Sequence, residues 1–386
     1  MTETTTSPVL DQPDESDFVK EDKGIAVASP RRLMWWKFRK HRVAVVSLVV
    51  LVILYLMAIF AGFLSPYDPN SYNSQFKFVP PMQITFIDGQ GNFSFRPGVN
   101  KLIGERDPDT LRITYKTDDS VWYPIRFFVK GEPYTLFGFL NLDIHLFGLG
   151  DEAKGMPIFP IGSDRLGRDV FSRVLYGGQV SLSIGLVAVF LSVALGIVLG
   201  GISGYYGGLV DNIIQRVIEF IRSLPSLPLW MALSAALPPD MPQESRYFGI
   251  TIILSVIGWT SLGRQVRGRF LALRTDDFVL AARLSGASDW RVIIRHMVPS
   301  FTSHIIASLT LSIPGIILAE TALSFLGLGL RQPAISWGIL LQEAQNIRTV
   351  ALSPWLLLPG IAVVITVLAF NFLGDGMRDA ADPFNR

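Results

Sequence analysis

Cysteine, histidine and carboxylate side chains are the usual carriers of chemistry, and this sequence arranges few of them for it. It has no cysteine, which excludes disulfide bonds, thiol catalysis and cysteine-ligated metal. Its histidines lie far apart, without a spacing such as HExxH that would place two metal ligands on one helix face. These are His41, His145, His296 and His304. We therefore expect no catalytic residue and no metal site, and interpret the histidines as ordinary hydrogen-bonded side chains.

Nucleotide chemistry is not expected from this chain either. The phosphate-binding motif GxxxxGK[ST] requires a Gly-Lys dipeptide, and none occurs among the 386 residues. We therefore expect the chain to bind no cofactor. A net charge of +2 is too small to indicate a nucleic-acid partner.

The most distinctive polar stretch is DDFVLAARLSGASDWRVIIRHMVP, at residues 276–299. Its two leading aspartates suit the positive end of a helix dipole, and apolar residues follow them at helical spacing. Gly286 can end this helix in the left-handed conformation, and Ser288 can cap a second helix that Pro299 stops. The pattern predicts a helix-turn-helix elbow whose small alanines let another backbone approach. An amphipathic hairpin resting on lipid is the alternative.

Three polar residues interrupt apolar segments near the carboxyl end. Glu320 lies inside an apolar run, where an isolated carboxylate is costly and should face a bundle interior or water. We expect it to pair with an arginine or to hold neighbouring backbone, with contact to a transported solute as the alternative. Asn371 and Asp375 close the last apolar run and are expected to bind structure there.

These polar residues lie in or between segments suited to a bilayer. Hydrophobic residues make up 49% of the chain, charged residues 17%, and the mean hydropathy is +0.39, more apolar than a soluble core requires. Residues 43–64 contain no charge and reach the roughly 20 residues that a membrane-spanning helix needs. Six spans are expected, the other five at 182–203, 213–237, 247–262, 303–326 and 354–373. Charged residues and two prolines interrupt the third span, so its first half is expected to be interfacial or to line a bundle.

Positive charges indicate how these spans are oriented. The stretch RRLMWWKFRKHR, just before the first span, is rich in Lys and Arg and therefore predicts a cytoplasmic amino terminus. With six crossings that start inside, the elbow lies between the fourth and fifth spans and is back in the cytoplasm, and the arginines in and before it agree with that side. A cleavable signal peptide is not expected, and residues 1–29 are expected to be a disordered tail.

A long polar segment separates the first two spans and is predicted to lie outside the membrane. ITFIDGQGNFSF (84–95) and LRITYKTDDSVWYPIRFFVKG (111–131) alternate apolar and polar residues around turn residues, so each predicts a β-hairpin. Asp118, Asp119 and Asp143 are interpreted as turn or solvent carboxylates. We expect a β-rich insertion that packs on the outer face and touches a partner.

Four motifs carry a resemblance to a known family. AARLSGASDWRVIIRHMVP resembles the EAA loop of the permease subunits of bacterial ATP-binding-cassette (ABC) importers, with Leu280 in place of the leading glutamate. GSDRLGRDVFSRVLYGGQVSL, ETALSFLGLGL and AFNFLGDGMRDAADP resemble the dipeptide/oligopeptide/nickel branch, in particular its C-type subunit.

The resemblance implies a fold class and a domain organisation. The fold class is an all-α polytopic membrane protein of about six transmembrane helices, the ABC importer permease fold, with a β-rich periplasmic insertion. The expected parts are a cytoplasmic tail and basic interfacial segment (1–42), the first transmembrane helix (43–64), the β-rich insertion (65–161) and a five-helix core (162–386) that carries the elbow (276–299).

The resemblance also implies a function: a permease subunit that translocates di- or oligopeptides across the bacterial inner membrane. The implied partners are a homologous second permease subunit, two ABC ATPase subunits that use ATP and magnesium, a periplasmic substrate-binding protein and membrane lipid. Import of oligosaccharides or nickel by the same machinery is one alternative. A membrane-anchored sensor or enzyme that acts through its extracytoplasmic domain is another.

In such importers the elbow docks on an ATPase, so the resemblance implies a coupling role for it. The elbow residues expected to take part are Asp277, Ala281, Ala282, Arg283, Gly286, Arg291, Arg295, His296 and Pro299. In the charged stretch GSDRLGRDVFSR, Asp164 is expected to cap a short helix and Arg168, Asp169 and Arg173 to form charge pairs at the outer interface. Contact of this stretch with a soluble substrate-binding protein is the alternative.

Overall fold

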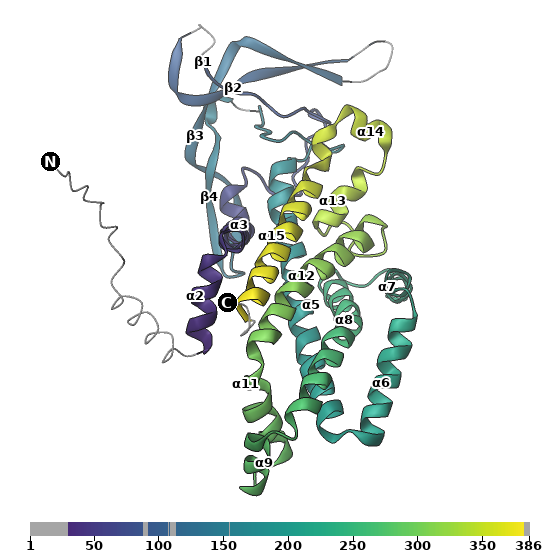
Figure 1. Ribbon diagram of the computed structural model, residues 1–386. Coiled ribbons are helices and arrows are strands. Elements are labelled where there is room, and N and C mark those ends of the chain that lie inside the picture. The colour runs from purple at the N-terminus through teal and green to yellow at the C-terminus, as the bar shows by residue number, and fades with distance from the viewer. Residues whose placement is uncertain (1–29, 88–91, 107, 109–112, 154, 382–386) are drawn as a thin grey trace, which may run out of the picture.

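A computed structural model describes residues 30–87, 92–106, 108, 113–153 and 155–381, and shows a helical bundle with a β-sheet at one end (Figure 1). The tail expected at residues 1–29 lies outside the described residues, as do parts of the two expected hairpins.

Five helices in the described part of the chain are long and apolar enough to cross a membrane. They are α3 (Arg42–Ile59), α5 (Val170–Tyr206), α8 (Gln243–Leu273), α12 (Thr302–Phe325) and α15 (Leu358–Ala381). A basic helix, α2 (Pro30–Lys40), precedes α3 and packs near the carboxyl end of α15. The expected first, second, fourth, fifth and sixth spans thus have a helix each.

The expected third span is not one helix. Its residues form the amphipathic α6 (Gly208–Ser223) and the short apolar α7 (Ser226–Ala235), and the chain is extended at Leu224 (ψ 138°). Proline disfavours the helical conformation in the residue before it, so Pro225 accounts for this break. In Figure 1, α6 and α7 together run upward beside α8. This path returns the chain to the end of the bundle where α8 begins.

Glycines bring the two longest helices into close contact. A Cβ atom added to Gly200 would lie 2.3 Å from the carbonyl oxygen of Gly263, and one added to Gly204 would lie 2.6 Å from that of Arg267. Only the missing side chains let α5 and α8 approach so closely. These glycines of the second expected span therefore serve close helix packing.

Four antiparallel strands form the sheet in the order β1-β2-β3-β4. They are β1 (Ile84–Ile87), β2 (Phe93–Arg106), β3 (Ile113–Leu136) and β4 (Leu140–Leu149). The β-rich insertion is confirmed, but the hairpin expected within 111–131 is wrong. Lys101 pairs with Asp118 and Asn100 with Trp122, so residues 119–121 form a bulge in one continuous strand. The Asp119 carboxylate accepts a hydrogen bond from Asn100 across the strands (2.7 Å), so the Asp-Asp pair does not turn the chain.

Short helices complete the two ends of the bundle. At the sheet end lie α4 (Ala61–Leu64), η1 (Asp151–Ala153), α13 (Trp337–Glu343), α14 (Ile347–Leu352) and η3 (Pro354–Leu357). At the opposite end lies the elbow, made of α9 (Asp277–Leu284), α10 (Asp289–Arg291), the π-helix η2 (Val292–Met297) and α11 (Val298–Ser300) (Figure 1). The bundle separates the sheet from the elbow.

Candidate functional site

The elbow has a small apolar core of its own. Val279, Val292, Ile293 and Met297 are buried there, together with residues from the ends of α5, α8 and α12. Because α8 enters the elbow at Leu273 and α12 leaves it at Thr302, this core fixes the elbow to three helices at once. The elbow is therefore built to move with the bundle as a rigid unit.

Gly286 forms the corner of the elbow in the left-handed conformation that its position predicts, with φ +80°. The Ala287 N–H donates to the Ala282 carbonyl (3.1 Å) and the Gly286 N–H donates to the Arg283 carbonyl (2.9 Å). This pair of bonds is the Schellman motif, which satisfies the last carbonyls of a helix. A Cβ atom at residue 286 would meet nothing within 4 Å, so the backbone conformation alone requires glycine here.

The second arm differs from expectation in two details. Ser288 precedes α10, but its hydroxyl makes no cap hydrogen bond, and its carbonyl accepts from Val292 N–H instead (3.0 Å). The helical run continues past Pro299 and ends at Ser300. The π-helix η2 ends two residues before Pro299, in a region where an α-helix would bring the proline ring against the carbonyl four residues back.

A three-residue contact, which we call the tyrosine brace, joins the elbow arms to α5. It consists of Tyr205, Arg283 and Asp289. The Tyr205 hydroxyl donates to Asp289 Oδ1 (2.6 Å) and accepts from Arg283 Nε (3.0 Å). The Arg283 guanidinium also lies 4.5 Å from the centroid of the Tyr205 ring. Arg283, expected to be free for a partner, thus contacts its own chain.

The brace borders an open cavity of about 700 Å³ between the elbow and the end of α5. Its lining residues are Tyr205, Tyr206, Arg274, Thr275, Leu280, Arg283, Ala287 and Asp289. Sequence reasoning missed Tyr205, Tyr206 and Asp289, because nothing in the sequence shows that the end of α5 lies against the elbow.

The outer surface of the elbow is unusually apolar. Leu284 is 90% exposed and Trp290 is 54% exposed, and Phe278, Leu280 and Ile294 are exposed as well. Contiguous exposed apolar residues on a protein are typical of an interaction surface. Around them Asp277, Ala281, Arg291, Arg295 and Pro299 are exposed, while Ala282 and His296 are half-buried.

An ion pair, also missed from the sequence, holds the helices that lead to the elbow. Arg267 of α8 donates from Nε and Nη2 to the two carboxylate oxygens of Asp211 in α6 (2.5 and 2.6 Å). The Ser203 hydroxyl of α5 donates to the same carboxylate (2.5 Å). Hydrogen bonding to Arg267 lowers the pKa of Asp211, so this carboxylate stays charged and keeps three helices together.

Glu320 is fully buried between α12 and α5. In the described part of the chain its carboxylate accepts hydrogen bonds from the hydroxyls of Ser181 (3.1 Å) and Ser324 (2.8 Å) rather than from an arginine. These hydroxyls in turn accept from the backbone N–H groups of Trp337 (3.1 Å) and Leu330 (3.2 Å). Glu320 therefore holds the segment after α12 through two serines.

The other two polar residues of the carboxyl end lie on α15, where Asn371 is half-buried and Asp375 is exposed. Close helix packing at this level comes from a glycine nearby. A Cβ atom on Gly376 would lie 2.3 Å from the Ala44 side chain of α3. The structural role expected of Asn371 and Asp375 stays a prediction.

The charged stretch before α5 is a buried network and not an interfacial helix. Arg168 bonds Asp164 (2.6 Å) and Glu343 of α13 (2.7 Å), and Arg173 is 1% exposed beside both acids. Asp164 holds a turn by accepting from the Leu166 and Arg168 N–H groups. The helix cap comes instead from Asp169, which accepts from Ser172 N–H (2.8 Å) at the start of α5. Burial raises the pKa of Asp169 to about 7 and also raises the pKa of Glu343.

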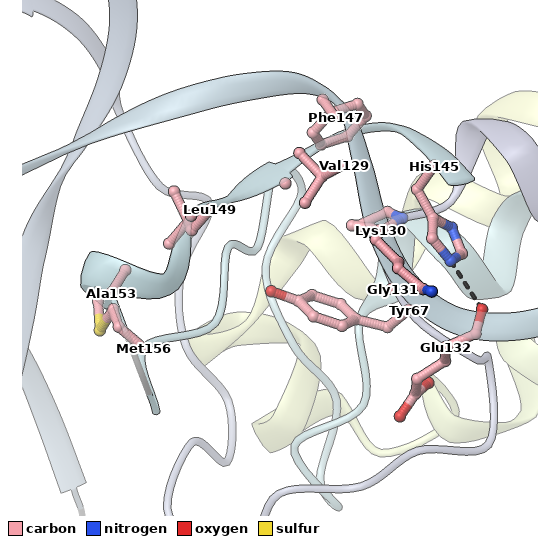
Figure 2. A pocket seen from close by; sticks show the side chains of 13 residues that line it. Tyr67, Val129, Lys130, Gly131, Glu132, His145, Phe147, Leu149, Ala153 and Met156 are labelled. Atoms are coloured by element: carbon pink, nitrogen blue, oxygen red, sulfur yellow. Dashed lines mark hydrogen bonds between the residues drawn. The ribbon is translucent and has the colours of Figure 1, made fainter. Parts of the chain in front are cut away.

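A separate cavity of about 430 Å³ lies at the sheet, between β3, β4 and the segment after α4 (Figure 2). His145 borders it and is 4% exposed. Its Nε2 lies 2.9 Å from the Glu132 carbonyl oxygen and its Nδ1 lies 2.5 Å from that of Ser65. The hydrogen-bonded role expected of this histidine is confirmed, and it links the sheet to the segment after α4.

Two protein-family models match the chain. The binding-protein-dependent transport system inner membrane component matches residues 196–386, and the N-terminal TM domain of oligopeptide transport permease C matches residues 29–81. The first match contains the elbow, α12 and α15, and the second contains α2, α3 and α4. The sheet lies between the two matched segments.

Two permeases are similar to the chain in sequence, and a solved structure is similar to it in fold. The dipeptide transport system permease protein DppC of Bacillus subtilis is 38% identical over 224 residues, which are 58% of this chain and 68% of that protein. The glutathione transport system permease protein GsiD of Shigella flexneri is 43% identical over 223 residues, 58% of this chain and 71% of that protein. A solved structure of the MetNI methionine ABC transporter in an inward-facing conformation is 15% identical with a TM-score of 0.42, and covers 54% of this chain and 96% of that one. The chain belongs to the family of binding-protein-dependent transport system inner membrane components, the permease subunits of ABC importers.

Proposed function

We propose that this permease subunit moves peptides inward across the bacterial inner membrane. The observation that carries the proposal is the identity of 38% to 43% with permeases named for dipeptide and glutathione transport, over more than two thirds of each. The elbow and the buried Glu320 lie within residues 196–386, the segment that matches the transport-system family model. Import of oligosaccharides or of nickel is the alternative, and a substrate test distinguishes it from peptide import.

The proposed complex contains a homologous second permease, two ABC ATPases and a periplasmic substrate-binding protein. ATP and magnesium are used by the ATPases. The exposed apolar elbow surface around Leu284 and Trp290 supports docking of an ATPase, because such a surface is unfavourable in water. The nine elbow residues of the sequence-based prediction surround or support this surface, and we propose them as the coupling site.

The proposed orientation places the amino terminus and the elbow in the cytoplasm and the sheet in the periplasm. The basic last turn of α2, with Lys37, Arg39 and Lys40, supports this orientation because positive residues favour the cytoplasmic side. The proposed division is a tail and basic segment at 1–42, a first span at 43–64, an insertion at 65–161 and a core at 162–386. The sheet lies within the proposed insertion.

Uptake by the reconstituted complex tests the proposal. All subunits are placed in proteoliposomes that contain ATP, and labelled dipeptides and oligopeptides are compared with nickel and oligosaccharides. We expect ATP-dependent uptake of peptides only, and loss of uptake when the binding protein is left out. ATP-dependent uptake of nickel or sugar without peptide uptake would replace the proposed substrate, and uptake without the ATPases would contradict the assembly itself.

A further inference from the structure

The tip of the β3–β4 hairpin is an exposed apolar surface that lies apart from the elbow and from the buried Glu320. Between Glu132 and Asp143 the chain has no charged residue. At the tip Phe137 is 61% exposed, Phe139 is 79% exposed and Leu140 is 43% exposed. Such a cluster is unfavourable in water, so a partner of apolar character is required.

The tip lies beside the end of the first membrane helix. The Phe137 ring is 6.4 Å from the ring of Phe60, and the Phe128 ring is 6.2 Å from the ring of Phe63. The helix α3, which ends one residue before Phe60, has 18 residues and so is about 27 Å long. This length nearly equals the hydrocarbon thickness of a bilayer, roughly 30 Å, so Phe60 lies at its edge. In Figure 1 the β3–β4 hairpin extends toward α3, and β4 begins at its tip.

The turn is made from residues that a turn in water rarely uses. Phe137 and Gly138 have φ +56° and +78°, and the Phe139 N–H donates to the Leu136 carbonyl across them (3.4 Å). Hairpin turns of this kind favour Asn, Asp or Gly at the positive-φ positions, and a bulky aromatic residue is strained there. This strained residue carries an exposed ring that lies near the ring of Phe60.

The backbone of the tip is suited to shallow contact with lipid. Leu136 pairs with Leu140 and Thr135 with Asn141, and the Thr135 hydroxyl donates to Asn141 Oδ1 (3.0 Å). Polar groups near lipid must be satisfied within the protein, and this hairpin meets that condition directly behind its tip. The Thr135–Asn141 pair also limits how deeply the hairpin can enter the lipid, because only the residues from Leu136 to Leu140 lie beyond it.

The base of the hairpin is held firmly. A Cβ atom on Gly62 would lie 2.3 Å from the Tyr134 ring, so α4 and β3 are in close contact. His145 lies between the carbonyl oxygens of Ser65 and Glu132, as described above, and Figure 2 shows its contact with Glu132. The position of the tip relative to α3 is therefore fixed by packing.

We propose that Phe137, Phe139 and Leu140 insert into the bilayer surface at the level where α3 ends. Lipid is the occupant because the tip continues the exposed apolar surface formed by Leu56 and Ile59 of α3 and by the adjoining Phe60. Aromatic side chains are enriched at this level of membrane proteins. The hairpin then anchors the sheet to the membrane at a second point, independently of which solute the complex carries.

Site-specific fluorescence tests the insertion. Since the chain has no cysteine, Phe139→Cys gives one labelling site, and Phe95→Cys gives a matched control on β2 that is 92% exposed. Each chain is labelled with an environment-sensitive dye and assembled with its partner subunits in lipid nanodiscs. For residue 139 we expect blue-shifted emission, at least twofold stronger quenching by lipids nitroxide-labelled near the headgroup than by lipids labelled near the chain end, and weak quenching by iodide. For residue 95 we expect no lipid quenching.

Two results overturn the proposal. One is strong iodide quenching and no lipid quenching at residue 139, which places the tip in water. The other is protection from iodide that is lost when the second permease or the binding protein is left out of the assembly, again without lipid quenching, which makes the tip a protein interface. The same measurement on Phe137→Cys checks that the result belongs to the tip and not to one strained or rearranged residue.

Discussion

At the scale of single residues, Tyr205 is the contact that ties the elbow to the bundle. Its hydroxyl accepts from Arg283 in one arm and donates to Asp289 in the other, so a single oxygen atom connects α5, α9 and α10. If the elbow transmits ATPase motion, this hydroxyl keeps its two arms in a fixed relation to α5.

Tyr205→Phe tests that role. The variant keeps the ring and its stacking with Arg283 but removes two hydrogen bonds to charged groups, which are worth about 1–2 kcal/mol at this partly exposed site. Since about 1.4 kcal/mol corresponds to a factor of ten, we expect peptide transported per ATP hydrolysed to fall by roughly five- to thirtyfold, with ATP hydrolysis retained. Uptake and phosphate release are measured in the same proteoliposomes.

Tyr206→Phe is the matched control. Tyr206 also donates to Asp289, but over 3.2 Å and from a side chain that is 54% exposed, and it has no contact with Arg283 among the described interactions. We expect little change in coupling. Equal losses in both variants, or no loss in either, would contradict a specific role for Tyr205.

Gly286 can be tested at the same scale, because its Cβ position is empty and only its backbone angle needs glycine. Moving a non-glycine residue into the left-handed region costs about 1–2 kcal/mol, and more for a β-branched one. We expect Gly286→Val to leave membrane insertion intact and to abolish uptake, whereas Gly286→Asn, which tolerates this conformation, retains most of it.

Gly268 provides the comparison for this change. It lies in α8 with equally open space at its Cβ position and no positive φ, so Gly268→Ala should leave uptake unchanged. Insertion is checked by membrane fractionation and uptake by the transport assay. Normal uptake and coupling in Gly286→Val would show that the elbow need not hold this corner.

At the scale of elements, sequence periodicity predicted the pieces but not their contacts. Helical spacing and Gly286 indicated the elbow, and long apolar runs indicated the five long helices, because both signals are local. The ion pair between Asp211 and Arg267 joins residues 56 positions apart, which one sequence cannot reveal. The sequence predicts a turn at the bulge of residues 119–121, because Asp-Asp is common in turns. In the structure the Asp119 carboxylate instead bonds Asn100 on the neighbouring strand.

The start of α5 should make stability depend on pH through Asp169. An ordinary aspartate has a pKa near 4, whereas burial raises that of folded Asp169 to about 7. Between about pH 4 and pH 7 the folded chain therefore keeps a proton that the unfolded chain has lost, so stability falls as the pH rises through this window and changes no further above it. Asp164 beside it acts in the same direction, by raising this pKa.

Asp169→Asn separates the cap from the charge. Asparagine caps helices as well as aspartate but does not titrate. When the pH is raised from 5 to 7.5, we therefore expect the midpoint temperature of unfolding to fall less in this variant than in the unchanged chain. Asp169→Ala should lose about 1 kcal/mol at both pH values, because the cap itself is removed. Thermal unfolding in detergent at the two pH values measures this, and identical pH dependence in the unchanged chain and Asp169→Asn would contradict it.

At the scale of the whole molecule, the bundle separates two surfaces that need different surroundings. The elbow presents exposed Leu284 and Trp290 at one end, and the sheet lies at the other (Figure 1). Residues 82–195, between the two family matches, contain the entire sheet, which lies at the opposite end of the bundle from the elbow. The sheet therefore makes none of the contacts proposed to couple the chain to an ATPase.

The two ends can be assigned to the two sides of the membrane with matched cysteines. Leu284 is 90% exposed and Phe95 is 92% exposed, so a cysteine at either position should react equally well when it is accessible. With the positive residues of α2 directing the amino terminus inward, we expect an impermeant maleimide to label Phe95→Cys in intact spheroplasts and Leu284→Cys only in inverted vesicles. Adding the ATPases should protect residue 284 and leave residue 95 unchanged, because only the elbow is proposed to dock them. Labelling of both cysteines from one side would contradict the fold's separation of the two ends. Labelling of residue 284 from outside would reverse the proposed orientation, and the elbow could then not dock ATPases in the cytoplasm.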